Sequence, residues 1–210
     1  MPMKKLLIVT GPQGSGNHLF ARILSLHPNV RGWEKLHDKY WVPSDEEPFA
    51  RFWVKPEELT KEHFADGDFF CANVSVPFFY DGVRQVPKIK EVAQKAISLG
   101  VQPIIALIVR DRNINELQQK RVGGEVTMDT ALEYFKDLTC HFIDHEAFFL
   151  WKEKYIEYLG RLFEFPVTTE GIDNFITVDA NHKYVVPIKE HWLDNEIRRG
   201  RKPFKQRLEE

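Results

Sequence analysis

The sequence has few cysteines and no long apolar run. Its two cysteines, Cys71 and Cys140, lie far apart within apolar stretches, so we expect both to be buried free thiols. The apolar run Leu6–Thr10, which follows Lys4 and Lys5, is too short for the core of a signal peptide. No segment approaches the roughly 20 apolar residues that span a bilayer. We therefore expect a soluble, cytoplasmic protein without a membrane partner.

The sequence also lacks an excess of either charge. Its formal net charge is −2 at pH 7, which gives no general attraction to nucleic acid, and we expect no nucleic-acid partner. Basic residues gather instead in a C-terminal tail at about 196–210. The length of 210 residues suits one domain, spanning 1–210, with a full apolar core, and it leaves the oligomeric state open.

Apolar, β-prone runs alternate along the chain with segments of helical periodicity. This alternation is typical of a parallel sheet with helices on both of its faces. We expect a three-layer α/β, P-loop-like fold around a mostly parallel sheet of about five strands, with an irregular surface excursion or lid at about 37–68. The predicted strands are Leu6–Thr10, 30–33, 69–79, Ile104–Val109 and His141–Asp144, and the predicted helices are one between Gly16 and Pro28, Lys88–Leu99, 114–120, 129–138 and Phe148–Phe163.

A glycine-rich loop follows the first predicted strand. The segment Gly11–Gly16 leads directly into an amphipathic helix, a layout in which backbone N–H groups and the helix N-terminus face an anion. The loop nearly matches the nucleotide-kinase pattern G-x-x-x-x-G-K-[ST], but Asn17 replaces the lysine and His18 replaces the serine or threonine. The sequence therefore predicts a phosphate site without the side chains that hold magnesium-bound triphosphate.

A second polar segment ends the most apolar predicted strand. Because ligands of parallel sheets collect outside the carboxyl ends of the strands, we expect Arg110-Asp111 to lie near the loop after Thr10. The histidines and acidic residues of 141–146 suggest a metal site at first sight. No further cluster of ligands accompanies them, so we interpret them as a polar strand edge and expect no metal.

These two segments together resemble the sulfotransferases that use 3'-phosphoadenosine 5'-phosphosulfate. Members of that family carry P-[KR]-S-G-[TN]-[THW] after the first strand and then H-P-x-V, to which Ser15-Gly16-Asn17-His18 and His27-Pro28-Asn29-Val30 correspond. Their second signature is a buried strand that ends in V-R-D-P, and Val109-Arg110-Asp111 fits its start. The similarity runs in patches from about residue 5 to about residue 170.

The resemblance implies a set of cofactor-binding residues. Arg110 is expected at the 3'-phosphate, since a guanidinium fork suits that anion. In the family a serine follows the arginine of the second signature by some eight positions, and here that position is occupied by Gln118. Arg199-Gly200 is similar to an Arg-Lys-Gly element of cytosolic members. The residues expected to hold the 5'-phosphosulfate are Gly14, Ser15, Gly16, Asn17 and His18, and Gln13 is also expected to bind the cofactor. The chain departs from the family pattern at Gly14, in place of arginine or lysine, and at Arg112, in place of proline.

An acceptor hydroxyl also needs a base to take its proton. Glu34 follows the second predicted strand, and heparan-type sulfotransferases carry a catalytic glutamate in a similar place. His37 is the competing candidate, because cytosolic members use a histidine and histidine ordinarily titrates near neutral pH. The choice between Glu34 and His37 stays open.

The resemblance thus implies a metal-independent sulfotransferase that transfers a sulfuryl group to a hydroxyl of a small molecule, glycan or lipid and leaves 3',5'-ADP. A sulfuryl group carries less negative charge than a γ-phosphoryl group, so backbone dipoles and a few cations can stabilise its transfer. Two alternatives remain. One is a P-loop nucleotide or nucleoside kinase, which Asn17 and His18 disfavour; the other is a non-catalytic protein that binds a nucleotide or phosphate.

Overall fold

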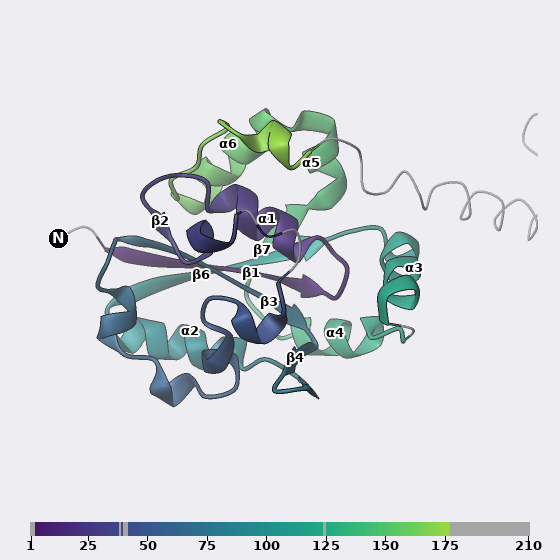
Figure 1. Cartoon of the computed structure of the whole chain (residues 1–210), viewed down its shortest axis with the longest axis horizontal. Helices are drawn as coiled ribbons and strands as arrows, with labels where there is room; N and C mark the ends of the chain where they lie inside the picture. Colours follow the sequence, from purple (N-terminus) through teal and green to yellow (C-terminus); the bar gives the residue numbers. More distant parts are fainter. Residues whose placement is uncertain (1–2, 38, 40–41, 124, 177–210) are drawn as a thin grey trace, which may run out of the picture.

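The structure is built on one five-stranded parallel sheet. The computed structural model describes residues 3–37, 39, 42–123 and 125–176, and there the strands lie in the order β2-β3-β1-β6-β7 (Figure 1). The first strand of the chain is therefore central, and its residues Leu6–Val9 are fully buried. The strands of the sheet are β1 (Lys4–Pro12), β2 (Val30–Arg31), β3 (Phe69–Val76), β6 (Val101–Val109) and β7 (His141–Asp144).

Helices cover both faces of the sheet, which confirms the predicted three-layer α/β fold. In Figure 1, α1 (Asn17–Leu24), α5 (His145–Trp151) and α6 (Glu153–Phe163) lie on one face, and α2 (Ile89–Ser98) and α4 (Met128–Phe135) lie on the other. Helix α3 (Arg112–Gly123) lies beyond the carboxyl end of β1 (Figure 1). Among the described residues, no helix is both long and apolar enough to cross a membrane.

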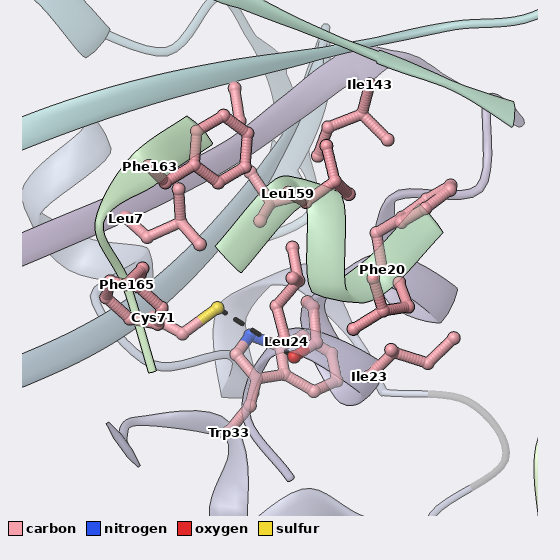
Figure 2. Close-up of a cluster of buried hydrophobic side chains, with 14 of the residues drawn as sticks. Leu7, Phe20, Ile23, Leu24, Trp33, Cys71, Ile143, Leu159, Phe163 and Phe165 are labelled. Carbon is pink, nitrogen blue, oxygen red and sulfur yellow. Dashed lines mark hydrogen bonds between the residues drawn. The ribbon is translucent and has the colours of Figure 1, made fainter. Parts of the chain in front are cut away.

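A dense apolar core joins the helical layer of α1, α5 and α6 to the sheet (Figure 2). Phe20, Ile23 and Leu24 recur at helical spacing on α1, and all three are fully buried. The ring of Phe20 meets the ring of Phe148 from α5 edge to face, with 5.1 Å between the centroids. This core fixes α1, and with it the loop that precedes α1, against the sheet.

Cys71 belongs to the same core, as the sequence predicted. Its Sγ donates a weak hydrogen bond to the carbonyl oxygen of Ala21, 3.8 Å away (Figure 2). Burial raises the pKa of the Cys71 thiol far above its ordinary value, and the nearby charge of Glu34 adds to this increase. Cys140 is also a free thiol, but it is only partly buried.

The segment between β2 and β3 forms a chain of short 3-10 helices. They are η1 (Trp33–Leu36), η2 (Ser44–Glu46), η3 (Ala50–Trp53), η4 (Pro56–Glu58) and η5 (Lys61–Phe64). Phe52, Trp53, Leu59 and Phe64 are all buried and pack with the second face of the sheet and α2. The excursion expected at about 37–68 is therefore irregular in backbone, but its apolar side chains form part of the core.

Two predicted elements are interrupted in the structure. The single helix predicted over Phe148–Phe163 is instead α5 and α6, because Lys152 between them has a φ of +45°. The strand predicted over 69–79 ends at Val76, and the chain continues as a hairpin of β4 (Phe78–Tyr80) and β5 (Val83–Gln85). Hydrophobic periodicity does not report such breaks, because it continues across them.

The turn after β2 depends on a glycine that lies against β3. Gly32 has a φ of +117°, and a Cβ added there would lie 2.2 Å from the backbone oxygen of Cys71. We expect Gly32→Ala to lower the free energy of unfolding by about 3 kcal/mol or more, since backbone strain of about 1–2 kcal/mol and overpacking both act.

Gly82→Ala is the matched control for this substitution. Gly82 also has a positive φ, +72°, but a Cβ there would meet no atom within 4 Å. Urea denaturation should show the loss of about 1–2 kcal/mol that strain alone causes. Equal losses at the two glycines would mean that the close approach of Gly32 to β3 contributes nothing to stability.

Candidate functional site

The loop between β1 and α1 has the backbone shape of an anion site. Gly14 and Gly16 have φ values of +81° and +104°, which only glycine adopts readily, and the N–H of Ser15 donates to the carbonyl oxygen of Pro12 at 3.1 Å. Gly16 is the N-cap of α1, and no side chain caps that helix. The first amides of α1 are therefore left for a ligand or solvent, at the end where the helix dipole favours negative charge.

The side chains of Ser15 and Asn17 in the loop form hydrogen bonds inside the protein. Ser15 and Asn17 are both buried, and the Ser15 hydroxyl donates to Asn17 Oδ1 at 3.0 Å. Asn17 Nδ2 donates to Ser75 Oγ on β3 at 2.8 Å and to the carbonyl oxygens of Gly11 and Pro12 at 3.3 Å. Asn17, at the kinase lysine position, thus ties the loop to the sheet, and it can contribute to a ligand only through its backbone N–H.

Arg110 meets the loop as the sequence predicted. β6 pairs in parallel with β1, with Leu107 opposite Thr10, so the two strands end at the same edge. The Arg110 Nη1 donates to the carbonyl oxygen of Gly14. Arg112 lines the cavity beside this edge and forms ion pairs with Glu116 and Asp129 on the surface. Arg110 is therefore the arginine of this segment that lies at the loop.

Helix α3 supports the loop from a second side. Gln119 Nε2 donates to the carbonyl oxygen of Gln13 at 2.8 Å, and Gln119 Oε1 accepts from the backbone N–H of Thr127 at 2.8 Å. Gln118 lies against Gly14, where an added Cβ would come within 2.7 Å of its Cγ. The predicted residue Gln118 is thus at the site. Gln119 was missed, although a glutamine four residues after Asn115 on one helix face was a signal for it.

The start of α5 brings His145 and Glu146 to the loop from a third side. His145 is 1% exposed, and a Cβ added at Gly16 would lie 2.8 Å from its Cδ2. Its Nδ1 lies 3.8 Å from Glu146 Oε1, and this contact, together with the backbone N–H of Asp111 and the charge of Arg110, lowers the pKa of Glu146. The sequence pattern of 141–146 indicated only a polar strand edge, so both residues were missed as parts of the site.

A buried carboxylate lies beside the first turn of α1. Glu47 Oε1 is 2.7 Å from His18 Nε2, and Glu47 Oε2 accepts from Asn73 Nδ2 on β3 at 2.7 Å. Burial raises the pKa of Glu47, and the bonds from His18 and Asn73 oppose that increase. The His18 ring also packs against Trp33, with 5.3 Å between the centroids. Glu47 belongs to the acidic run that follows Ser44, and nothing in the sequence distinguishes it from its acidic neighbours.

The two predicted bases lie away from the loop. His37 Nε2 is 2.9 Å from the hydroxyl of Ser25, the C-cap of α1, and Ser25 is about 10 Å from His18 along the helix. Glu34 is near Cys71, which pairs with Leu7 in the middle of the sheet. Arg199 and Gly200 lie outside the described residues.

An apolar cavity of about 140 Å³ adjoins the loop. It opens between the end of β6, α3 and α4, and its walls include Pro12, Leu107, Arg110, Met128 and Phe135. Among the described residues, no group of three or more His, Cys, Asp or Glu side chains could hold a metal ion. The edge of the sheet thus combines a glycine-shaped loop, the uncapped start of α1, and an apolar hollow lined in part by Arg110 and Arg112.

No family model, curated protein or solved structure matches the chain. The likeness to sulfotransferases therefore rests on the motifs alone, and the geometry of the site is the remaining guide to function.

The raised pKa of Glu47 predicts a pH-dependent cost to stability. At low pH the carboxyl is protonated in both states; above its ordinary pKa of 4.5 it ionises in the unfolded chain while the folded state still resists ionisation. Wild type should therefore lose stability relative to Glu47→Gln as the pH rises from about 4 to about 7. Urea denaturation of both proteins across this range measures the difference, and a relative gain by wild type would contradict the assignment.

Proposed function

We propose that the loop binds the 5'-phosphosulfate end of 3'-phosphoadenosine 5'-phosphosulfate and that the protein is a sulfotransferase. The main support is the glycine-shaped loop, whose polar side chains turn inward while its main chain and the uncapped start of α1 lie beside Arg110. Oriented amides of this kind bind an anion without a side-chain cation, which accommodates Gly14 at the position where the family has arginine or lysine.

The remaining parts of the nucleotide have matching surroundings. Arg110 serves the 3'-phosphate, because its guanidinium is charged at all relevant pH values and the residue stands at the loop. Gln118, which packs on Gly14, offers an amide to the same group. The apolar cavity beside Arg110 suits the adenine ring, since purines bind well against aliphatic and aromatic walls.

The kinase alternative has less support from the same residues. A kinase of this loop type places a lysine on the β- and γ-phosphates and a hydroxyl on magnesium. Asn17 stands at the lysine position and uses its amide inside the protein, and His18 stands at the hydroxyl position and bonds to Glu47. A sulfuryl group needs less charge neutralisation than a triphosphate does. Asn17 and His18 therefore suit sulfuryl transfer better than phosphoryl transfer. A non-catalytic protein that binds a nucleotide or phosphate is the second candidate, because Gly14 leaves the loop without a cation of its own.

Ligand-induced stabilisation tests the proposal directly. We expect 3',5'-ADP, with EDTA present, to stabilise the protein by about 2.7 kcal/mol at 100 times its Kd, which raises the Tm by roughly 5–10 °C for a chain of this length. AMP should act more weakly because it lacks the 3'-phosphate. Stabilisation by ATP with magnesium alone would favour the kinase, and no response to 3',5'-ADP would overturn the proposal.

The role of Arg110 in the 3'-phosphate site is tested by Arg110→Ala. Loss of a charged hydrogen bond should weaken 3',5'-ADP binding by about 1.5–3 kcal/mol, with AMP binding nearly unchanged, in isothermal titration calorimetry. Arg51→Ala is the control, since exposed Arg51 is paired with Glu58, is not among the residues that line the cavity, and should leave both affinities unaltered. If Arg110→Ala weakens both nucleotides equally, Arg110 supports the loop through Gly14 and does not contact the 3'-phosphate.

A further inference from the structure

Three side chains from three elements converge beside the proposed sulfuryl site. His18 stands in the first turn of α1, Glu47 follows η2, and Asn73 lies on β3. Each Glu47 oxygen has one partner, at 2.7 Å from His18 Nε2 and 2.7 Å from Asn73 Nδ2. Trp33 packs on the imidazole from η1. The ring of His18 is therefore held in place on two sides, while its side chain stays 30% exposed.

This arrangement is unfavourable for stability. The Glu47 side chain is 5% exposed, and a carboxylate removed from water to that degree destabilises the fold unless its partners compensate. Its raised pKa indicates that the compensation is incomplete. Buried ionisable groups whose charge is incompletely compensated are frequent at functional sites. There they are kept for their chemistry although they lower the stability of the fold.

The hydrogen bond from Glu47 determines what His18 can do. A carboxylate that accepts the Nε2 proton leaves the lone pair of neutral imidazole on Nδ1, the nitrogen on the other side of the ring. Among the described residues, the titratable group bonded to Glu47 is His18 from α1, and its other partner, Asn73 from β3, is uncharged. Trp33 from η1, which packs on His18, is uncharged too. A carboxylate fixed on one imidazole nitrogen so that the other acts as a base is a recurrent catalytic arrangement.

We propose that His18 is the general base of the reaction and that Glu47 is its positioning residue. The inference rests on the proposed sulfotransferase function, and it names a hydroxyl compound as the acceptor class. His18 lies in the first turn of α1, so its backbone belongs to the helix start that is proposed to bind the phosphosulfate. Glu34 and His37 lack that position: Glu34 lies beside Cys71, and His37 bonds at the other end of α1.

In the transfer step, the acceptor oxygen forms a bond to sulfur while the bond from sulfur to the 5'-phosphate oxygen breaks. The electron pair of the broken bond stays on that phosphate oxygen, which leaves as part of 3',5'-ADP. The acceptor proton moves to His18 Nδ1, and the resulting imidazolium is stabilised by the Glu47 carboxylate across the Nε2 bond.

The substitutions that test this inference preserve the buried contacts. His18→Gln keeps a donor for Glu47 but has no basic nitrogen. Glu47→Gln keeps an acceptor for His18, and Asn73 can pair with the new amide because its Oδ1 has no hydrogen-bond partner among the described residues. Glu46→Gln is the matched control, since exposed Glu46 is bonded to Lys39 at 3.2 Å and stands one residue away.

Release of 3',5'-ADP from 3'-phosphoadenosine 5'-phosphosulfate is measured with phenol, glucose, a tyrosyl peptide or water as acceptor. We expect His18→Gln to lower kcat by about 10²–10⁴-fold and Glu47→Gln by at least about tenfold, with the KM for the donor within about threefold of wild type. The double variant should be no slower than His18→Gln, because the two residues act as one unit. Glu46→Gln should match wild type.

The outcomes separate the inference from the proposed function. Absence of stabilisation by 3',5'-ADP overturns the sulfotransferase proposal itself. If 3',5'-ADP binds but wild type releases none from the donor, or if His18→Gln or Glu47→Gln keeps full kcat, the assignment of His18 and Glu47 is wrong. Equal increases in KM without loss of kcat would give the pair a binding role and also overturn it.

Discussion

The candidate site depends on the parallel pairing of β1 with both β3 and β6. This pairing places the end of β1 in the middle of the sheet, and it brings Ser75 of β3 and Arg110 after β6 to the same edge as the loop. The chain crosses to one side of β1 to form β2 and β3 and later to the other side to form β6 and β7. The point where the order reverses is where open parallel sheets bind ligands.

The loop at this point is shaped by contacts on its inner side. Asn17 and Ser15 use their side chains to tie the loop to β3, so the main chain is the surface that remains for an anion. Gln118 and His145 come so close to Gly14 and Gly16 that side chains at those positions would collide with them. Glycine is thus required at both positions for two reasons: the φ values are positive, and the neighbouring side chains leave no room for a Cβ. A loop that is fixed in this way loses little conformational freedom when a ligand binds, which favours binding.

The parts of the site that follow from strand order were predictable from the sequence, and the parts that follow from long-range packing were not. Two apolar runs ending in Gly11 and Arg110 sufficed to place the loop and the arginine at one edge. Glu47 was missed because it sits in an acidic run of an irregular segment, and only its long-range contacts with His18 of α1 and Asn73 of β3 bring it to the site. The predictions of Glu34 and His37 rest on the likeness to a glutamate of heparan-type sulfotransferases and a histidine of cytosolic ones, and such a likeness does not report how the chain folds after β2. The 3-10 turn that buries Trp33 leaves Glu34 near Cys71 and His37 near Ser25, away from the loop.

The proposed function requires that the main chain of the loop bind the anionic end of a nucleotide without a divalent ion. Two-dimensional ¹H–¹⁵N NMR during titration with 3',5'-ADP in EDTA tests this requirement at the level of single amides. We expect the backbone signals of Gly14, Gly16 and His18 to shift most, with the Arg110 side-chain signal following at the same ligand concentrations. Saturable changes confined to other parts of the chain, with these amides unaffected, would contradict it.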